Sequence, residues 1–365
     1  LLATSPDLIV RSTGSILRYQ DQLLDPRRVG EELDASAVLD ASFQRLGGRF
    51  RVTARLMETA TGRSLWAGKV DVKIDDLFEV QDQVAQGIAE GLTPRLTRPA
   101  SAAREFVPAP EAYLHYMRGM NALGVFTETS VRDSIREFER AVELERDYAA
   151  AWLALGRSYH SLVDGGFHAD PSWYEKAEAA LARAREVDPH VPHLYWALGA
   201  LHLVRGRKRE AYRDLAIALE RAPNFAYVHH YFAYLFRLCD MPDESYAAEL
   251  RAQELDPNVI LHYTGLCRAE TLRRGADEGI AWLNKARERL GPSARLEYHE
   301  LRSLAFEGRY AEIKELMQRR QTSRPTGGHH HWESLFWLLA GEPERAAGME
   351  RAAHSYAMID MDGAE

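Results

Sequence analysis

Three prolines at equal intervals in the middle of the chain constrain its fold more than any other feature. Pro189, Pro223 and Pro257 are 34 residues apart, and each ends a stretch typical of a helix: AREVDP, ALERAP and AQELDP. Proline stops a helix because its ring clashes with the preceding turn. Small residues, which let two helices approach closely, recur five and twelve positions before each proline: Ala184, Ala218 and Ala252, then Ala177, Ala211 and Ser245. The pattern predicts a helical hairpin that is repeated along the chain.

The helix before each of the first two proline-ended helices carries a motif of its own. These motifs are Trp152, Leu155, Gly156 and Tyr159 in AWLALGRSY, and Tyr195, Leu198, Gly199 and His202 in YWALGALH. Together with the small and proline positions, they resemble the tetratricopeptide repeat (TPR) across residues 111–358. The resemblance implies an all-α superhelical solenoid of about six to seven helix pairs. The motif weakens near 263–292 to Tyr263, Leu266, Leu283 and Ala286, and beyond 294 we expect helices without a firm register.

Two of the repeats are longer than the others. The extra residues lie in VDGGFHADP, after Leu162, and in GVFTETS, after Leu123. Loops accept added length at small cost, because the entropy of closing a loop grows only logarithmically. We therefore expect both insertions to enlarge the loops between helices.

Residues 1–95 follow a different pattern, which predicts strands. In RFRVTARLMET the apolar side chains of Phe50, Val52, Ala54 and Leu56 alternate with Arg49, Arg51, Thr53 and Arg55. This period of two is typical of a half-buried strand. Glycines at 47, 48 and 62 supply turns, so three antiparallel strands are expected. An amphipathic helix should follow, with an apolar stripe of Leu77, Val80, Val84, Ile88 and Leu92.

The stretches VRSTGSILRY, DPRRVGEELDASAVLDASFQRLGGRFRVTARLMETATGRSLWAGKVD and LFEVQDQVAQGIAEGL together resemble the TolB-like (FlgO-like) amino-terminal domain. That module joins TPR arrays at the end of bacterial serine/threonine kinases, class III adenylate cyclases and winged-helix regulators. The family's first strand and helix are absent, so we expect an amino-terminally truncated copy at residues 1–96. The predicted fold is an α+β N-terminal domain followed by an all-α TPR solenoid, with a linker at 97–110 and a tail at 359–365.

Charge and composition argue against several classes of partner. The formal net charge of −8 leaves no overall basic surface for nucleic acid. No stretch is apolar over the roughly 18 residues that a membrane span needs, so we expect no direct membrane insertion. Cys239 and Cys267 lie in helical stretches, and no CxxC pair is present. Cytoplasm and periplasm both remain open, as does tethering by an upstream membrane helix.

Sequence motifs for catalysis are near misses only. HELRS at 299–303 has Ser303 where a second zinc ligand would stand, and GRSLWAGKV lacks both the spacing and the hydroxyl of a phosphate-binding loop. IDMDGAE at 359–365 ends before a calcium loop could close. We expect no catalytic residues, no cofactor and no metal site in this chain.

The inner groove of the predicted solenoid is the better candidate for function. The first helix of a TPR presents its second, fifth, ninth and twelfth positions to the groove. In this register they include Arg157, His160, His193, Trp196, Tyr227, His230, Tyr234, Arg237 and Arg268. Aromatic and arginine side chains dominate binding hot spots, so a protein or peptide ligand with acidic and aromatic character is the hypothesis. The alternative is that several of these residues only pack against neighbouring helices.

The groove positions differ from those of the TPR domains that hold a C-terminal carboxylate with lysine and asparagine. The fifth positions are Leu153, Trp196, His230 and Thr264, and the ninth are Arg157, Ala200, Tyr234 and Arg268. That specific clamp is absent from the sequence.

Three interpretations of the whole chain follow. The first is a non-catalytic interaction and regulatory module. The second is the carboxy-terminal sensor of a signalling enzyme, kinase or cyclase, with its catalytic domain upstream. The third is a scaffold for homo-oligomerisation through the α+β domain.

The stretch GGHHHWESLFW at 327–337 contains three consecutive histidines. After the two glycines, an apolar face can run from His331 through Leu335, Leu338 and Leu339, with Trp332 and Phe336 beside it. Adjacent residues on a helix point about 100° apart, so three such rings do not converge on one metal ion. We therefore expect a helix from His331 rather than a metal site.

Overall fold

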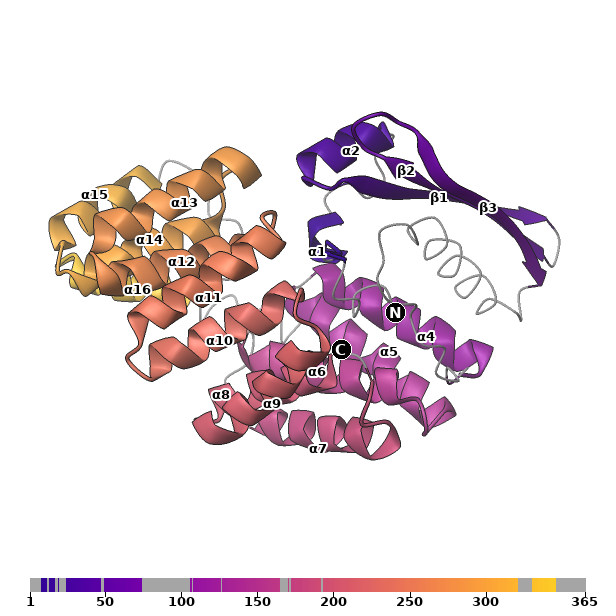
Figure 1. Ribbon diagram of the computed structural model, residues 1–365. Helices are drawn as coiled ribbons and strands as arrows, with labels where there is room; N and C mark the ends of the chain where they lie inside the picture. Colours follow the sequence, from indigo (N-terminus) through magenta and orange to yellow (C-terminus); the bar gives the residue numbers. More distant parts are fainter. Residues whose placement is uncertain are drawn as a thin grey trace. The chain divides into compact units, whose positions relative to one another are not determined.

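The computed structural model (Figure 1) describes residues 8–11, 13–16, 19, 24–46, 49–73, 106, 108–125, 127–164, 170, 172–191, 193–320 and 330–345. The amino-terminal elements are α1 (Thr13–Ile16), α2 (Pro26–Glu32), β1 (Ala37–Leu46), β2 (Arg49–Glu58) and β3 (Ser64–Lys73). The helices that follow are α4 (Pro110–Val125), α5 (Glu128–Leu144), α6 (Ala149–Asp164), α7 (Ser172–Val187), α8 (Leu194–Val204), α9 (Lys208–Arg221), α10 (Ala226–Leu238), α11 (Pro242–Leu255), α12 (Ile260–Arg273), α13 (Ala276–Leu290), α14 (Ala294–Phe306), α15 (Tyr310–Arg320) and α16 (His330–Leu339). None of the described helices is long and apolar enough to cross a membrane.

The three strands form an antiparallel meander in the order β1-β2-β3, which confirms the predicted sheet. Ala54 and Leu56 of β2 are buried, whereas Thr53 and Arg55 are exposed. The alternation therefore gives the sheet one buried face and one solvated face. The predicted amphipathic helix and most of the predicted linker lie outside the described residues.

The helical part consists of TPR-like antiparallel pairs. Contacts pair α4 with α5, α6 with α7, α8 with α9 and α12 with α13. The small residues that recur before the prolines are all buried, as predicted: Ala177, Ala184, Ala211, Ala218, Ser245 and Ala252. The weaker motif residues Tyr263, Leu266, Leu283 and Ala286 are buried as well.

The motif glycines permit the closest approach within two of these pairs. A Cβ atom at Gly156 would lie 2.7 Å from Leu181 Cγ, and one at Gly199 would lie 2.7 Å from Leu215 Cγ. Real Cβ atoms do not approach other atoms so closely, so each position requires glycine for the observed packing. The repeat motif thus corresponds to a physical contact between paired helices.

The prediction that both insertions enlarge loops is wrong for the first. Helix α4 continues to Val125 and α5 begins at Glu128, so the extra residues lengthen the helices. Thr127 begins α5 through a capping box, in which its side chain and that of Ser130 each accept a hydrogen bond from the other's backbone N–H. This cap starts a new helix directly after α4. In the second case α6 ends at Asp164 and α7 begins at Ser172, as expected for a longer loop.

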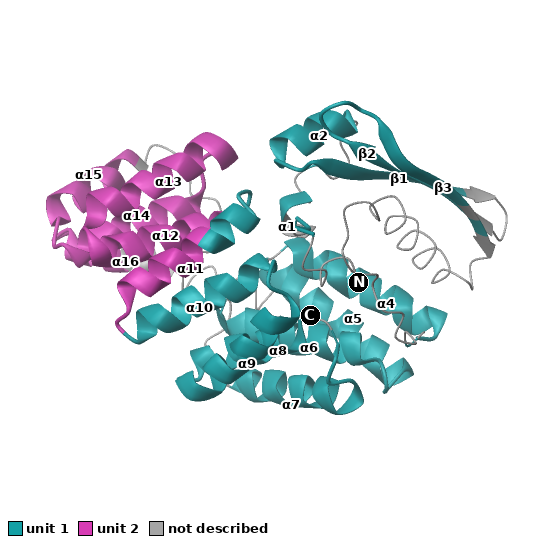
Figure 2. Ribbon diagram, in the orientation of Figure 1, with its two compact units in different colours: residues 1–239, 251–259 teal, residues 240–250, 260–365 magenta. Residues whose placement is uncertain are grey.

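The chain divides into two compact units (Figure 2). Unit 1 comprises Leu1–Cys239 and Arg251–Val259, and unit 2 comprises Asp240–Leu250 and Ile260–Glu365. Helices α4–α10 therefore belong to unit 1, and α12–α16 belong to unit 2.

Helix α16 corrects the predicted apolar face of GGHHHWESLFW. The helix begins at His330, and its buried residues are Phe336 and Trp337, which are 3% and 1% exposed. Leu335 and Leu338 are 53% and 51% exposed, so the predicted stripe through them is wrong. The physical reason is that Phe336 and Trp337 fill a core with Leu301, Leu304, Ile313 and Met317 of α14 and α15. The side chains of the three histidines lie outside the described part.

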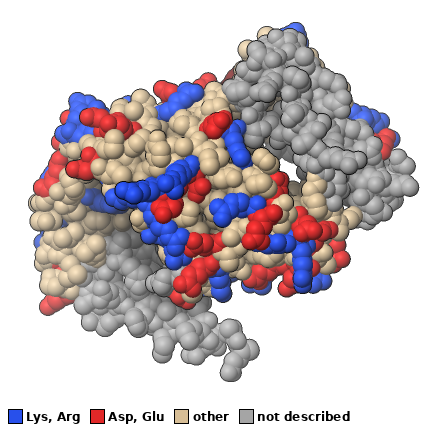
Figure 3. Space-filling view, turned by 60° about the horizontal axis from the view of Figure 1, so that its bottom comes forward, with Lys and Arg blue, Asp and Glu red and all other residues tan. Residues whose placement is uncertain are grey.

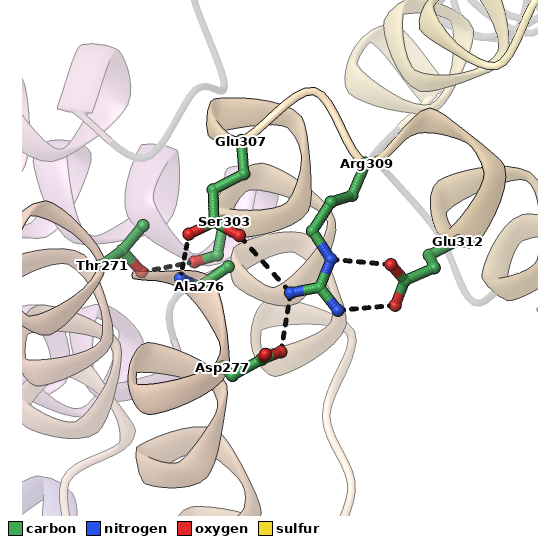
Figure 4. A network of polar contacts seen from close by, with 7 residues as sticks. All are labelled: Thr271, Ala276, Asp277, Ser303, Glu307, Arg309 and Glu312. Carbon is green, nitrogen blue, oxygen red and sulfur yellow. Dashed lines mark hydrogen bonds and ion pairs between the residues drawn. The ribbon is translucent and has the colours of Figure 1, made fainter. Parts of the chain in front are cut away.

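A network of charged side chains joins α13, α14 and α15 in unit 2 (Figure 4). Glu307 Oε1 accepts a hydrogen bond of 2.7 Å from the backbone N–H of Ala276, at the start of α13. The N-cap residue Gly275 has no side chain to do this. Arg309 donates to Asp277 at 2.6 Å and to both carboxylate oxygens of Glu312, at 2.7 and 2.8 Å. Glu307, which directly follows α14, therefore caps the start of α13.

Replacing Glu307 with alanine should lower the stability of the α13 start by about 1 kcal/mol, because its N–H loses an acceptor. Glu307→Gln should cost less, since the amide oxygen can still accept. Hydrogen exchange at the Ala276 amide reports the difference. Glu288→Ala, an exposed position of α13, is the control, and equal exchange in Glu307→Ala and the control would contradict the cap.

Candidate functional site

Helices α6, α8 and α10, together with α4, bring one arginine and several aromatic rings together in unit 1. The Cζ atom of Arg157 lies 4.9 Å from the centre of the Trp196 ring, a cation–π contact. The Trp196 ring lies 5.6 Å from that of Tyr227 and 5.9 Å from that of Tyr231. Tyr116 of α4 is near enough for its charge state to influence the pKa of Arg157. We call these five residues the Arg157 cluster.

The Arg157 cluster places a cation in a poorly solvated environment. Burial is the largest effect on the pKa of Arg157 and lowers it. Burial also raises the pKa of Tyr116 and of Tyr231, so both remain neutral phenols. Within the described part of the chain, Arg157 makes no ion pair with a carboxylate. Its guanidinium instead lies on the face of the Trp196 ring.

Buried polar atoms without a hydrogen-bond partner among the described residues include atoms of predicted groove residues. Trp196 Nε1, His193 Nδ1 and His160 Nε2 are such atoms. A buried polar atom without a partner costs about 1–3 kcal/mol. Because most buried polar atoms in proteins are paired, these atoms are candidate contacts for a bound group.

His193 immediately precedes α8 and has a left-handed backbone, with φ of 67°. Its ring packs on Phe225, with 4.1 Å between ring centres. A non-glycine residue in this conformation is strained and is held there by its surroundings. Burial, with the nearby charge of Arg157, lowers the pKa of His193 to about 4, so the ring is neutral at pH 7.

This depressed pKa predicts a loss of stability in mild acid. Between about pH 6.5 and pH 4 the unfolded chain binds a proton at His193 and the folded chain does not, so stability falls as pH falls. At pH 5 the loss should be on the order of 2 kcal/mol. His193→Asn removes the titration while tolerating the left-handed backbone. Urea denaturation at pH 7 and pH 5 should therefore show a smaller decrease for the variant, and equal decreases would contradict the assignment.

The other predicted residues of unit 1 lie around the Arg157 cluster. His160 is buried, with its ring centre 6.1 Å from that of Tyr174, and burial lowers its pKa. His230 is 5% exposed and lies edge-on to Tyr231 at 5.4 Å. In α10, Arg237 Cζ lies 4.9 Å from the ring centre of Tyr234. Burial of His160 and His230 fits the packing alternative for these two residues.

Arg268 belongs to unit 2, on α12, where it lies next to Cys267. Burial raises the pKa of the Cys267 thiol, and the charge of Arg268 opposes this only in small part. Arg268 is therefore not a member of the Arg157 cluster.

Counting repeat positions missed Tyr116, Tyr231 and Phe225. Phe225 lies 5.3 Å from Trp196 in an edge-on arrangement. Tyr231 is four residues after Tyr227 and so shares its helix face, a signal that the sequence contains. Tyr116 could not be found in this way, because its nearness to Arg157 depends on how α4 packs beside α6.

Comparisons with known proteins were made for the whole chain. No family model matches it. Over 150 residues, or 40% of this chain, it is 33% identical to a Rhizobium meliloti (strain 1021) protein named "Putative adenylate cyclase 3". The match spans only 26% of that relative's length.

Two solved structures are similar to this chain in part. One is a tetratricopeptide repeat protein from Parabacteroides merdae ATCC 43184, with a TM-score of 0.47, 14% identity, and coverage of 67% of this chain and 93% of that one. The other is a thermophilic TPR protein of Thermus thermophilus, with a TM-score of 0.45, 17% identity, and coverage of 53% and 99%. The description of this chain as TPR-like rests on its own 34-residue period and helix contacts.

Proposed function

We propose that the chain is a non-catalytic interaction module whose unit 1 binds a protein or peptide partner at the Arg157 cluster and at Tyr234 and Arg237. The single observation that carries the proposal is the Arg157 guanidinium, held against Trp196 without a carboxylate among the described residues. Arginine, tryptophan and tyrosine are the residues most enriched in binding hot spots. Their assembly from separate helices brings charge and apolar area together in one site.

Charge favours a protein partner over nucleic acid. The chain carries a formal net charge of −8, and acidic and basic side chains are interspersed on the face in Figure 3. Affinity for nucleic acid depends on many positive charges that follow the phosphate backbone. One arginine among aromatic rings suits a protein segment better.

The test begins with peptides selected from a random display library on the immobilised full chain. The affinity of a selected peptide is then measured by fluorescence anisotropy for the wild type and for Tyr234→Ala combined with Arg237→Ala. We expect at least a roughly tenfold loss, as for hot-spot residues. Tyr212→Ala, at an exposed position of α9, is the control. Unchanged affinity of every selected peptide for the double variant would remove Tyr234 and Arg237 from the binding surface.

A regulatory role within a signalling enzyme is the second candidate. It is supported by the match to the Rhizobium meliloti relative, whose name describes a cyclase. Under this proposal residues 1–96 are the TolB-like module and transmit binding in the repeats to an output domain. Reading the coding sequence upstream of Leu1 tests the idea, since kinase HRD and DFG motifs or the metal-binding aspartates of a cyclase would support it.

Contacts within unit 1 offer a route for such coupling. Arg11 donates from Nε to the carbonyl of Leu33, at 3.0 Å, and from Nη1 to the carbonyl of Leu255. Ser15 Oγ donates to Asp256 Oδ1 at 2.7 Å, and both side chains are 1% exposed. The amino-terminal segment therefore ties the end of α2 to the end of α11.

A further inference from the structure

The Arg157 cluster offers hydrogen-bond donors to a bound group. Arg157 has five N–H groups and cannot accept. Trp196 Nε1 is a buried donor without a partner among the described residues, and an indole nitrogen cannot accept either. The ring of Tyr231 lies 5.9 Å from that of Trp196, and burial raises the pKa of its hydroxyl, which therefore stays protonated and can donate. The cluster is thus suited to a group that only accepts hydrogen bonds.

The charge of the surroundings limits the charge of that group. Arg157 supplies one positive charge, and Asp164 of α6 is near enough to raise the pKa of both Tyr231 and Tyr174. A dianionic phosphate would leave an excess negative charge close to the Asp164 carboxylate in a poorly solvated site, where unpaired charge is costly. A single carboxylate balances Arg157 and matches the planar fork of its guanidinium.

The aromatic rings of the cluster limit which side chains of a ligand can lie next to its carboxylate. Trp196 presents its face to Arg157, and Tyr227, Tyr231 and Phe225 surround the same ring within 6 Å. Rings in such contact stabilise an adjoining apolar or aromatic side chain. The lysine and asparagine that bind a C-terminal carboxylate in other TPR domains are replaced in this chain. The bound carboxylate therefore need not be the C-terminus of a peptide and can belong to a side chain.

We propose that Arg157 receives the carboxylate of one aspartate or glutamate side chain inside an acidic and aromatic peptide segment of the partner. Trp196 forms the wall against which Arg157 is held, and the hydroxyl of Tyr231 donates to the bound carboxylate. This inference rests on the proposed function and specifies the chemistry of its ligand.

The experiment uses three labelled peptides on the full chain. The first is a short peptide of alternating glutamate and phenylalanine, blocked at both ends; in the second every glutamate is glutamine; in the third every glutamate is phosphoserine. We expect the glutamate peptide to bind the wild type about tenfold or more tightly than the glutamine peptide. Arg157→Gln should remove that preference. The four affinities, of wild type and variant for the glutamate and glutamine peptides, form a double-mutant cycle that measures the coupling between the carboxylate and Arg157.

The controls separate loss of binding from loss of folding. Arg209→Gln removes an equal charge at an exposed position of α9 and should leave the preference unchanged. Arg157→Lys keeps the positive charge but loses the planar guanidinium, and it should retain only part of the preference for the glutamate peptide. If Arg157→Gln is not folded by circular dichroism, Arg157→Lys and Trp196→Phe, which deletes only the indole N–H and part of the ring, provide the comparison.

Several outcomes would overturn the inference. Equal affinity for the glutamate and glutamine peptides, tighter binding of the phosphoserine peptide, or a preference that persists in Arg157→Gln would each exclude carboxylate recognition by Arg157. If both peptides bind equally and Tyr234→Ala with Arg237→Ala abolishes both, the binding surface stands and only its ligand chemistry is wrong. If none of the three binds, carboxylate recognition fails, and the library selection decides separately whether unit 1 binds peptides.

Discussion

Replacing Phe138 with alanine is expected to lower the free energy of unfolding by about 3–5 kcal/mol. Phe138 lies in α5 and is fully buried, and its ring fits against Gly119 of α4, where a Cβ would lie 2.6 Å from Cε1. Its ring centre is also 5.8 Å from that of Tyr116. Truncation removes the ring from this contact and leaves a cavity between the first two helices of the array.

Urea denaturation, with hydrogen exchange of the α4 and α5 amides, measures the effect. Gly119→Ala should be destabilising on its own by about 1–3 kcal/mol, because its methyl group meets the ring. In the Phe138→Ala background that cost should largely vanish, which is a non-additive result. Leu114→Ala, at a 51% exposed position of α4, should change stability by less than about 0.5 kcal/mol. Additive losses for Gly119 and Phe138 would contradict the packing of α4 on α5.

Replacing Trp337 with alanine should destabilise unit 2 by a similar amount, about 3–5 kcal/mol. The side chain is 1% exposed within the core of α14, α15 and α16, and Arg345 Cζ lies 4.8 Å from its ring centre. Leu335, two residues earlier on the same helix, is 53% exposed. Leu335→Ala should therefore be nearly neutral.

The matched pair distinguishes the two possible faces of α16. Denaturation of unit 2, followed by exchange of the α14 and α15 amides, should respond to Trp337→Ala and not to Leu335→Ala. A larger loss for Leu335→Ala than for Trp337→Ala would mean that the buried face runs through Leu335 and Leu338, as the sequence pattern predicts. Equal losses would mean that α16 packs on both faces.

The repeated helix pairs could be predicted because their constraints are local and periodic. Proline cannot continue the interior of a helix, and α7, α9 and α11 end two residues before Pro189, Pro223 and Pro257. Glycine or alanine is required where two paired helices touch. Gly156 and Gly199 meet Leu181 and Leu215 as the motif implies. The strand meander was predictable for the same reason, since alternation along β2 specifies its buried face.

The composition of the candidate site was predicted only in part. Repeat positions identified Arg157, Trp196 and Tyr227, which the structure brings together, and also Arg268, which belongs to unit 2. They did not identify Tyr116 or Tyr231. The position of a residue in a repeat gives the direction of its side chain, whereas its neighbours depend on how successive helices pack.

The sequence by itself determined where the proline-ended helices stop, which small residues lie between paired helices, and that aromatic and arginine side chains belong to the first helices. Only the tertiary structure decided that Arg157 lies on Trp196 without a carboxylate among the described residues, and that Phe336 and Trp337 are buried in α16. The first set follows from backbone chemistry and local periodicity. The second depends on side chains from helices far apart in the chain, whose packing no local pattern specifies.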